Sequence, residues 1–145
     1  MQQAKKGLTL IETMSVVGII GILATIAVMQ YGNYISRSKA ADTLAELAPY
    51  RQAIGVCYQN SGALANCNAG TFGIPAPLVS ANVKTLTLGN GVLAGTSSAT
   101  TSSGSAMGFT YAPNPEAGTA SLTWGMAGTI CDSSRGLKPG DGPCT

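Results

Sequence analysis

The chain has 145 residues, enough for one domain with at most an extended element beside it. It contains no histidine, which excludes metal binding and acid–base catalysis through imidazole. The net charge is +2 and is accounted for by Lys5 and Lys6, because the remaining chain has as many basic as acidic residues. No overall basic field therefore points to nucleic acid.

A long apolar segment follows these two lysines. Residues 13–29 are uncharged and span about 25 Å as a helix, at the lower edge of a membrane span. Glu12 precedes them, although a carboxylate at the centre of a bilayer costs about 2.5–3.5 kcal/mol. Thr9 and Glu12 have the spacing of a capping box, in which the glutamate accepts a hydrogen bond from the backbone N–H of Thr9. A removed secretory signal and a plain signal anchor are two further interpretations of the segment.

The helical pattern continues past residue 30 and becomes amphipathic. Apolar residues at three-to-four spacing, with charged residues between them, predict one stripe that covers a sheet. The stripe consists of Leu44, Leu47, Ile54 and Tyr58. We expect one helix over residues 8–59, with a bend at Pro49. Asn-Ser-Gly at 60–62 is expected to end it.

The composition changes from residue 63 to Gly, Ser, Thr, Ala and short alternating runs. Residues 83–95 predict a hairpin around Gly-Asn-Gly, and residues 108–126 a second pair of strands around a Pro/Gly turn. Between them, 96–106 is expected to be a polar loop, with O-glycosylation as a further alternative. The aromatic residues expected in the core are Phe72, Phe109, Tyr111 and Trp124. The fold class is therefore α+β: a long N-terminal helix and a C-terminal antiparallel sheet of about four strands.

Four cysteines in a small chain with an export-like segment predict two disulfides. No Cys-x-x-Cys pair is present, which argues against a zinc site. Three pairings are possible. We favour Cys57–Cys67 and Cys131–Cys144, because each closes a short loop that contains glycine. Each bond is expected to contribute about 3 kcal/mol by restricting the unfolded chain.

A basic leader that ends in Gly7, then Leu-Thr-Leu-Ile-Glu and an apolar helix, resembles the class III signal of type IV pilins and type II secretion pseudopilins. The resemblance covers residues 5–37 and is looser beyond them. Within that stretch it includes Gly21, Tyr31, Tyr34 and Arg37. It implies that a membrane prepilin peptidase cuts between Gly7 and Leu8 and methylates the new amine of Leu8. It also implies a single-pass subunit in the inner membrane, which the pilus assembly machinery draws into an extracellular helical filament of like copies.

The resemblance gives Glu12 an assembly role: its carboxylate pairs with the new amine of its own or a neighbouring subunit and sets the axial register. Removing one partner of a buried pair leaves a charge without compensation. Two positions depart from the family pattern. Leu8 stands where phenylalanine is usual. Met29 replaces the usual proline and leaves open how far the helix loosens.

The resemblance also divides the chain. The implied parts are a leader over 1–7, an apolar helix over 8–30, an amphipathic half-helix over 31–60, a loop over 61–83, and a sheet with a D-region over 84–145. In type IVa pilins a cysteine pair bounds this D-region, and Cys131–Cys144 is similar. Asp132 and Asp141 lie in it, but two carboxylates so far apart make a poor calcium site, so we expect a structural loop.

We therefore expect a structural protein and no enzyme, with neither cofactor nor metal. The favoured function is the major subunit of a type IV pilus that serves adhesion, twitching motility or DNA uptake. The alternatives are a minor pilin for DNA capture or adhesion, and a type II secretion pseudopilin. Lys84, Arg135 and Lys138 are the candidate DNA contacts. Three scattered cations predict only weak, salt-dependent binding.

Overall fold

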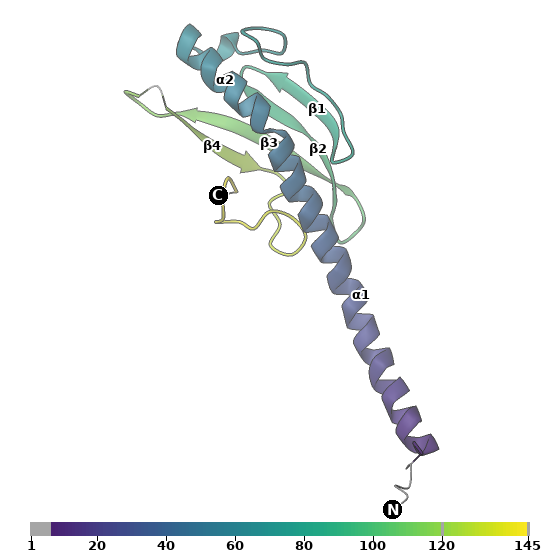
Figure 1. The fold of residues 1–145 in the computed structure, drawn as a ribbon. Helices are drawn as coiled ribbons and strands as arrows, with labels where there is room; N and C mark the ends of the chain where they lie inside the picture. The colour runs from purple at the N-terminus through teal and green to yellow at the C-terminus, as the bar shows by residue number, and fades with distance from the viewer. Residues whose placement is uncertain (1–6, 120, 145) are drawn as a thin grey trace, which may run out of the picture. The chain divides into compact units, whose positions relative to one another are not determined.

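The computed structural model of the protein describes residues 7–119 and 121–144. Helices and strands follow one another in the order predicted (Figure 1). They are α1 (Leu10–Glu46), α2 (Ala48–Ser61), the 3₁₀ turn η1 (Leu64–Asn66), β1 (Val83–Gly89), β2 (Val92–Thr100), β3 (Ala106–Pro115) and β4 (Leu122–Ala127). The chain forms two compact units, with the boundary between Gly32 and Asn33. The leader lysines Lys5 and Lys6 lie outside the described residues.

The four strands form one antiparallel meander, in which neighbours in sequence are neighbours in the sheet. Asn90 and Gly91 connect β1 to β2 and both have a positive φ, 52° and 76°. A two-residue hairpin turn of this hand matches the twist of the strands, and Asn-Gly suits it best. The predicted α+β architecture with a four-stranded antiparallel sheet is confirmed.

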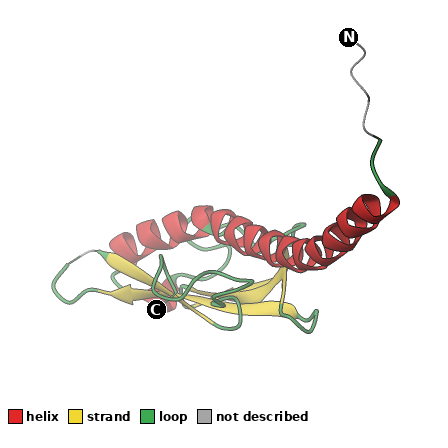
Figure 2. Cartoon of the chain, turned by 90° about the horizontal axis from the view of Figure 1, so that it is seen from below, coloured by secondary structure: helices red, strands yellow, loops and turns green. Residues whose placement is uncertain are grey.

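In the second unit, the end of α1 and all of α2 lie on one face of the sheet (Figure 2). The buried helix residues recur every three or four positions, so they form one stripe. This stripe consists of Ser36, Ala40, Thr43, Leu47, Tyr50, Ile54 and Cys57. In the predicted stripe, Leu47 and Ile54 are buried, whereas Leu44 and Tyr58 are only half-buried. The pattern of apolar residues missed Ser36 and Thr43 because their side chains are polar.

The single helix expected over 8–59 is two helices separated by Leu47. Pro49 lies in the first turn of α2 and has no N–H to donate to the preceding turn. Hydrogen bonds nevertheless continue on both sides: Leu47 N–H donates to the Thr43 carbonyl (3.2 Å) and Arg51 N–H to the Leu47 carbonyl (3.0 Å). The interruption is therefore local. Gly62, with φ of 70°, ends α2 in the left-handed conformation typical of helix C-termini.

The loop expected over 96–106 is wrong in its first half. Strand β2 continues to Thr100, and only residues 101–105 connect it to β3. Ser97 and Ala99 are fully buried. Small side chains allow helix and strand to approach closely, so the polar composition that predicted a loop belongs to a buried strand.

Phe72 is not in the core, contrary to the prediction, and 53% of its surface is exposed. Its φ is 49° and that of the following Gly73 is 77°. The tight turn that they form directs the ring away from the domain. For a bulky residue this conformation costs of order 1–3 kcal/mol. Phe109 and Tyr111 are buried as expected, and Trp124 is half-buried.

Candidate functional site

The N-terminal motif forms a complete capping box. The Thr9 backbone N–H and hydroxyl both donate to Oε2 of Glu12, at 2.7 and 2.6 Å, and Glu12 N–H lies 3.3 Å from the Thr9 hydroxyl. Glu12 also lies in the first turn of α1, where the helix dipole favours a carboxylate. The Glu12 side chain therefore points back towards the start of the chain. It contacts Thr9, the residue that directly follows Leu8.

Gly7 and Leu8 lie just before α1 and have no regular secondary structure. Leu8 is 77% exposed. The peptide bond between them is thus open to an enzyme, and no helix needs to unwind to present it. The Gly7–Leu8 bond and Glu12 are brought together at one end of α1.

The helix surface behind this motif is apolar and uncovered. From Leu8 to Tyr31 every residue is exposed. The most apolar stretch of this helical region has a mean hydropathy of 2.1 over 18 residues, and none of it is buried. By length and composition it is able to cross a membrane.

A ladder of hydroxyl groups fastens α1 to β2 in the second unit. The Thr43 and Ser97 hydroxyls lie 2.7 Å apart and both residues are fully buried. About two turns earlier in α1, the Ser36 hydroxyl donates to the Thr100 carbonyl (2.9 Å) and accepts from Thr100 N–H (2.9 Å). These bonds fix the register of the helix on the strand.

Two arginines, Arg37 and Arg135, join the C-terminal tail to α1 and to the end of β2. We call this set of contacts the arginine clasp. Arg135 donates to the Thr100 carbonyl (2.8 Å), the Thr100 hydroxyl (3.1 Å) and the Asn33 side-chain oxygen (2.9 Å). Arg37 in α1 donates to the Ser133 carbonyl. The clasp joins the end of the chain to the first residue of the second unit.

The tail itself is shaped by a disulfide and a carboxylate. Cys131 is bonded to Cys144, and Cys57 to Cys67, which is the sequence-local pairing. Asp132 accepts hydrogen bonds from the Ser134 hydroxyl and from the backbone N–H groups of Ser134 and Arg135. The Ser134 hydroxyl, aided by these N–H groups, lowers the pKa of Asp132. Asp132 therefore holds the turn that aims Arg135 at the clasp.

Comparison with known proteins agrees with this geometry. The model of the prokaryotic N-terminal methylation motif matches residues 2–28. Fimbrial protein EcpC of Eikenella corrodens is 32% identical over 128 residues, which is 86% of this chain and 83% of that protein. The chain belongs to the type IV pilin family.

Two further pilin matches involve proteins of Escherichia coli. Prepilin peptidase-dependent protein D of strain K12 is 38% identical over 89 residues, 61% of each chain. The solution structure of the major type IV pilin PpdD from enterohemorrhagic E. coli superposes with a TM-score of 0.52 at 28% identity, covering 67% of this chain and 74% of that one. For four of the curated relatives, this chain covers only between 36% and 61% of the relative's length.

As a member of this family the pilin is a structural subunit and not an enzyme. The candidate site is its N-terminus, where the methylation motif matches. Among residues 7–119 and 121–144, no group of three His, Cys, Asp or Glu side chains has the arrangement of a metal site.

The three candidate DNA contacts of the pilin are not equivalent. Lys84 is an exposed residue of β1, and Lys138 is exposed in the tail. The guanidinium of Arg135 is half-buried and already bonded to three acceptors within the chain. Arg135 is thus placed as a structural contact. No signal in the sequence indicated this role, because its partner Asn33 lies 102 residues away.

Proposed function

We propose that this pilin is the major subunit of a type IV pilus. The observation that carries the proposal is the exposed apolar half of α1, in a chain that also carries a folded, disulfide-bonded domain. So much uncovered apolar surface requires a partner other than water. Lipid provides it before assembly, and the helices of neighbouring copies provide it in the filament.

Processing creates the charge that Glu12 needs. Prepilin peptidase cuts between Gly7 and Leu8, and the new amine of Leu8 is methylated. Oε2 of Glu12 already accepts from Thr9, the residue directly after Leu8. The positive amine would then arise on the residue before Thr9, which Glu12 already contacts, and we expect it to pair with Glu12 in the same subunit or in the next one.

Two similarities support a role as major subunit. Curated relatives include type IV major fimbrial proteins FimA of Dichelobacter nodosus, one of them 45% identical over 73 residues. The E. coli PpdD structure that is similar to this chain is also that of a major type IV pilin. The filament would then serve adhesion, twitching motility or DNA uptake.

The decisive experiment is intact mass spectrometry of filaments sheared from the cell surface. We expect this chain as the dominant species, beginning at N-methylated Leu8 and carrying two disulfides. A chain that retains Lys5 and Lys6 in the filament would contradict processing at Gly7. A processed chain that stays in the inner membrane and never reaches filaments would instead identify a pseudopilin.

A role in DNA capture is tested separately on purified filaments. Of the three candidate cations, Lys84 and Lys138 are exposed, so a DNA-binding filament should lose salt-dependent affinity when both are replaced by alanine. Equal retention of DNA by wild-type and Lys84→Ala/Lys138→Ala filaments would exclude these residues as the contact. Filaments in which the chain is a trace component would indicate a minor pilin.

A further inference from the structure

Phe72 is displayed on the surface in a conformation that its side chain does not favour. Its φ of 49° and the φ of 77° at Gly73 lie in a turn closed by a bond from Ile74 N–H to the Thr71 carbonyl (2.9 Å). Turns with two positive φ values favour Asn, Asp or Gly at both positions. Among the described residues, only Phe72 and Asn90 combine a positive φ with a side chain. Folding of the monomer alone would favour another residue at position 72.

Hydrogen bonds and a disulfide hold the loop that carries Phe72. Asn68 N–H donates to the Thr71 hydroxyl (3.0 Å), and the Asn68 side-chain oxygen accepts from Asn90 N–H (2.9 Å) in the β1–β2 turn. The Cys57–Cys67 bond ties the start of the loop to α2. A ring held in this way loses little conformational freedom on binding, which favours affinity.

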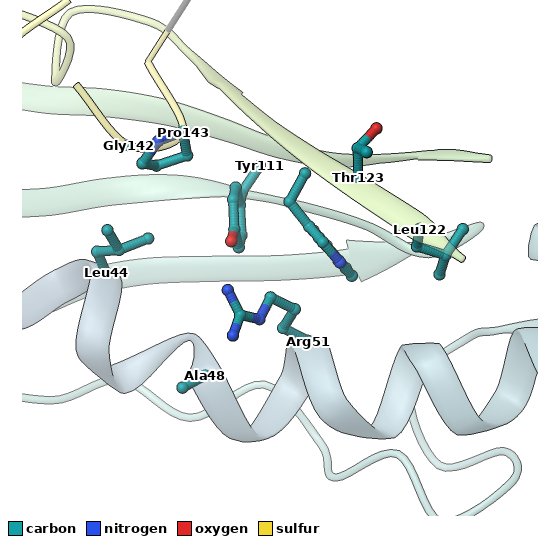
Figure 3. A pocket seen from close by; sticks show the side chains of 9 residues that line it. Leu44, Ala48, Arg51, Tyr111, Leu122, Thr123, Gly142 and Pro143 are labelled. Carbon is teal, nitrogen blue, oxygen red and sulfur yellow. The ribbon is translucent and has the colours of Figure 1, made fainter. Parts of the chain in front are cut away.

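A groove of about 480 Å³ lies between the helices and β4 (Figure 3). It is lined by Leu44 and Ala48 from the helices, Tyr111 and Trp124 from the sheet, and Pro143 from the tail. The Tyr111 and Trp124 rings are tilted against each other, with centroids 4.8 Å apart. An apolar cavity of about 150 Å³ suffices for a benzene molecule, so this groove has room for an aromatic side chain. The guanidinium of Arg51 points towards Tyr111, where it can stack on an incoming ring.

A helical filament requires a heterologous contact, in which one surface of a copy binds a different surface of the next. The second unit carries two such different surfaces, the exposed ring of Phe72 and the aromatic groove. Ala48 in the groove and Cys57, which holds the Phe72 loop, are separated by about 14 Å along α2. A copy displaced by roughly that distance along the helix axis brings its own Cys57–Cys67 bond, which holds the start of the Phe72 loop, level with the groove of its neighbour.

We propose that Phe72 of one copy inserts into the Tyr111–Trp124 groove of a neighbouring copy and so helps to set the axial step of the filament. The inference rests on the proposed function as a filament subunit. Leu78 and Val79 are also exposed apolar residues in the connection from helix to sheet. Neither has the positive φ that marks Phe72.

The test separates folding from assembly by replacing Phe72 with the residue that its turn prefers. Phe72→Asn should leave the melting temperature of the full-length chain in detergent unchanged or higher, because asparagine suits the turn. It should nevertheless lower the yield of sheared pili at least tenfold. Phe72→Tyr is the matched control, since it keeps the ring and should assemble within twofold of wild type. Ala48→Leu fills the groove from within and should reduce the yield as Phe72→Asn does.

A photo-crosslinking residue, p-benzoylphenylalanine, at position 72 identifies the contact in assembled pili. The adduct should map to a peptide of a second copy that contains Tyr111 or Trp124. Normal pilus yield from Phe72→Asn, or an adduct outside the groove, would overturn the inference while leaving the filament role intact. Failure of the wild-type chain to appear in any filament would overturn the proposed function and this inference together.

Discussion

The two parts of the helical region differ in what covers them. Between Leu8 and Tyr31 the large apolar side chains are exposed, Leu10 to 80% and Met29 to 69%. From Ser36 to Cys57 a side chain is buried in each turn, against the sheet of the same chain. One part is apolar on all sides and the other on a single stripe. Changes in the first part should therefore alter assembly, whereas changes in the second should alter the free energy of unfolding.

The largest effect is expected at Glu12. Glutamine retains an acceptor for the capping box but removes the charge, so Glu12→Gln separates the two roles. We expect at least a tenfold loss of surface pili, measured by shearing and immunoblotting, with the melting temperature of the domain unchanged. Cleavage after Gly7, followed by mass spectrometry, should continue. If Glu12→Gln gives as many pili as the wild type, the charge of Glu12 has no role in assembly and the residue only caps the helix.

In the part of the helical region that packs on the sheet, the largest loss of stability is expected when the arginine clasp is removed. Arg135→Ala removes three hydrogen bonds from a charged, half-buried group and should cost about 2–3 kcal/mol of unfolding free energy. Denaturant unfolding with circular dichroism measures it. Lys138→Ala is the control in the same tail, and it should change stability by less than about 0.5 kcal/mol because Lys138 is exposed. Equal effects of the two variants would rule out the clasp.

The hydroxyl ladder should contribute somewhat less. Thr43→Val preserves the shape of the side chain but leaves the Ser97 hydroxyl without its helix partner, which should cost about 1–2 kcal/mol. Adding Ser97→Ala should recover part of the loss, because it removes the Ser97 hydroxyl that Thr43→Val deprives of its helix partner. A double-mutant cycle in urea measures this coupling. Strictly additive changes would show that the two hydroxyls do not interact.

The smallest effect concerns pH. Because the pKa of Asp132 is lowered in the folded chain, its contribution to stability is present above the unfolded pKa of about 3.9 and is lost as the pH falls through the folded value. Wild type should therefore lose more stability than Asp132→Asn below about pH 4. Parallel acid unfolding curves compare them. Curves of identical shape would mean that the carboxylate does not hold the tail.

What the sequence predicted well was local. The Thr9–Glu12 capping box, the Asn90-Gly91 turn and the sequential hairpins each depend on residues close together in the chain. Local spacing and turn chemistry are sufficient for such features. The α+β class followed from them.

The features that escaped prediction depend on distant residues. Thr43 meets Ser97 across 54 positions, so nothing in the pattern around either residue marked it as buried. Arg135 appeared to be a free cation for the same reason. The prediction for Phe72 was wrong for a different reason. Phenylalanine is buried on average, but Phe72 lies in the tight turn at 71–74 and its ring is exposed. Where a polar residue is buried or an aromatic one is exposed, function or long-range packing overrides the average burial of that residue type.

The clasp is also the contact that joins the most distant parts of the second unit. The sheet is a meander, so its strands can pair in sequence as they emerge, at a small cost in loop closure. Arg135 meets Asn33 only across 102 residues, close to the whole length of the second unit. The contact that fastens the tail to α1 therefore cannot form before the chain has been synthesised as far as Arg135. A chain truncated before Arg135 would lack both this contact and the Cys131–Cys144 bond, so its tail would have neither tie to the rest of the second unit.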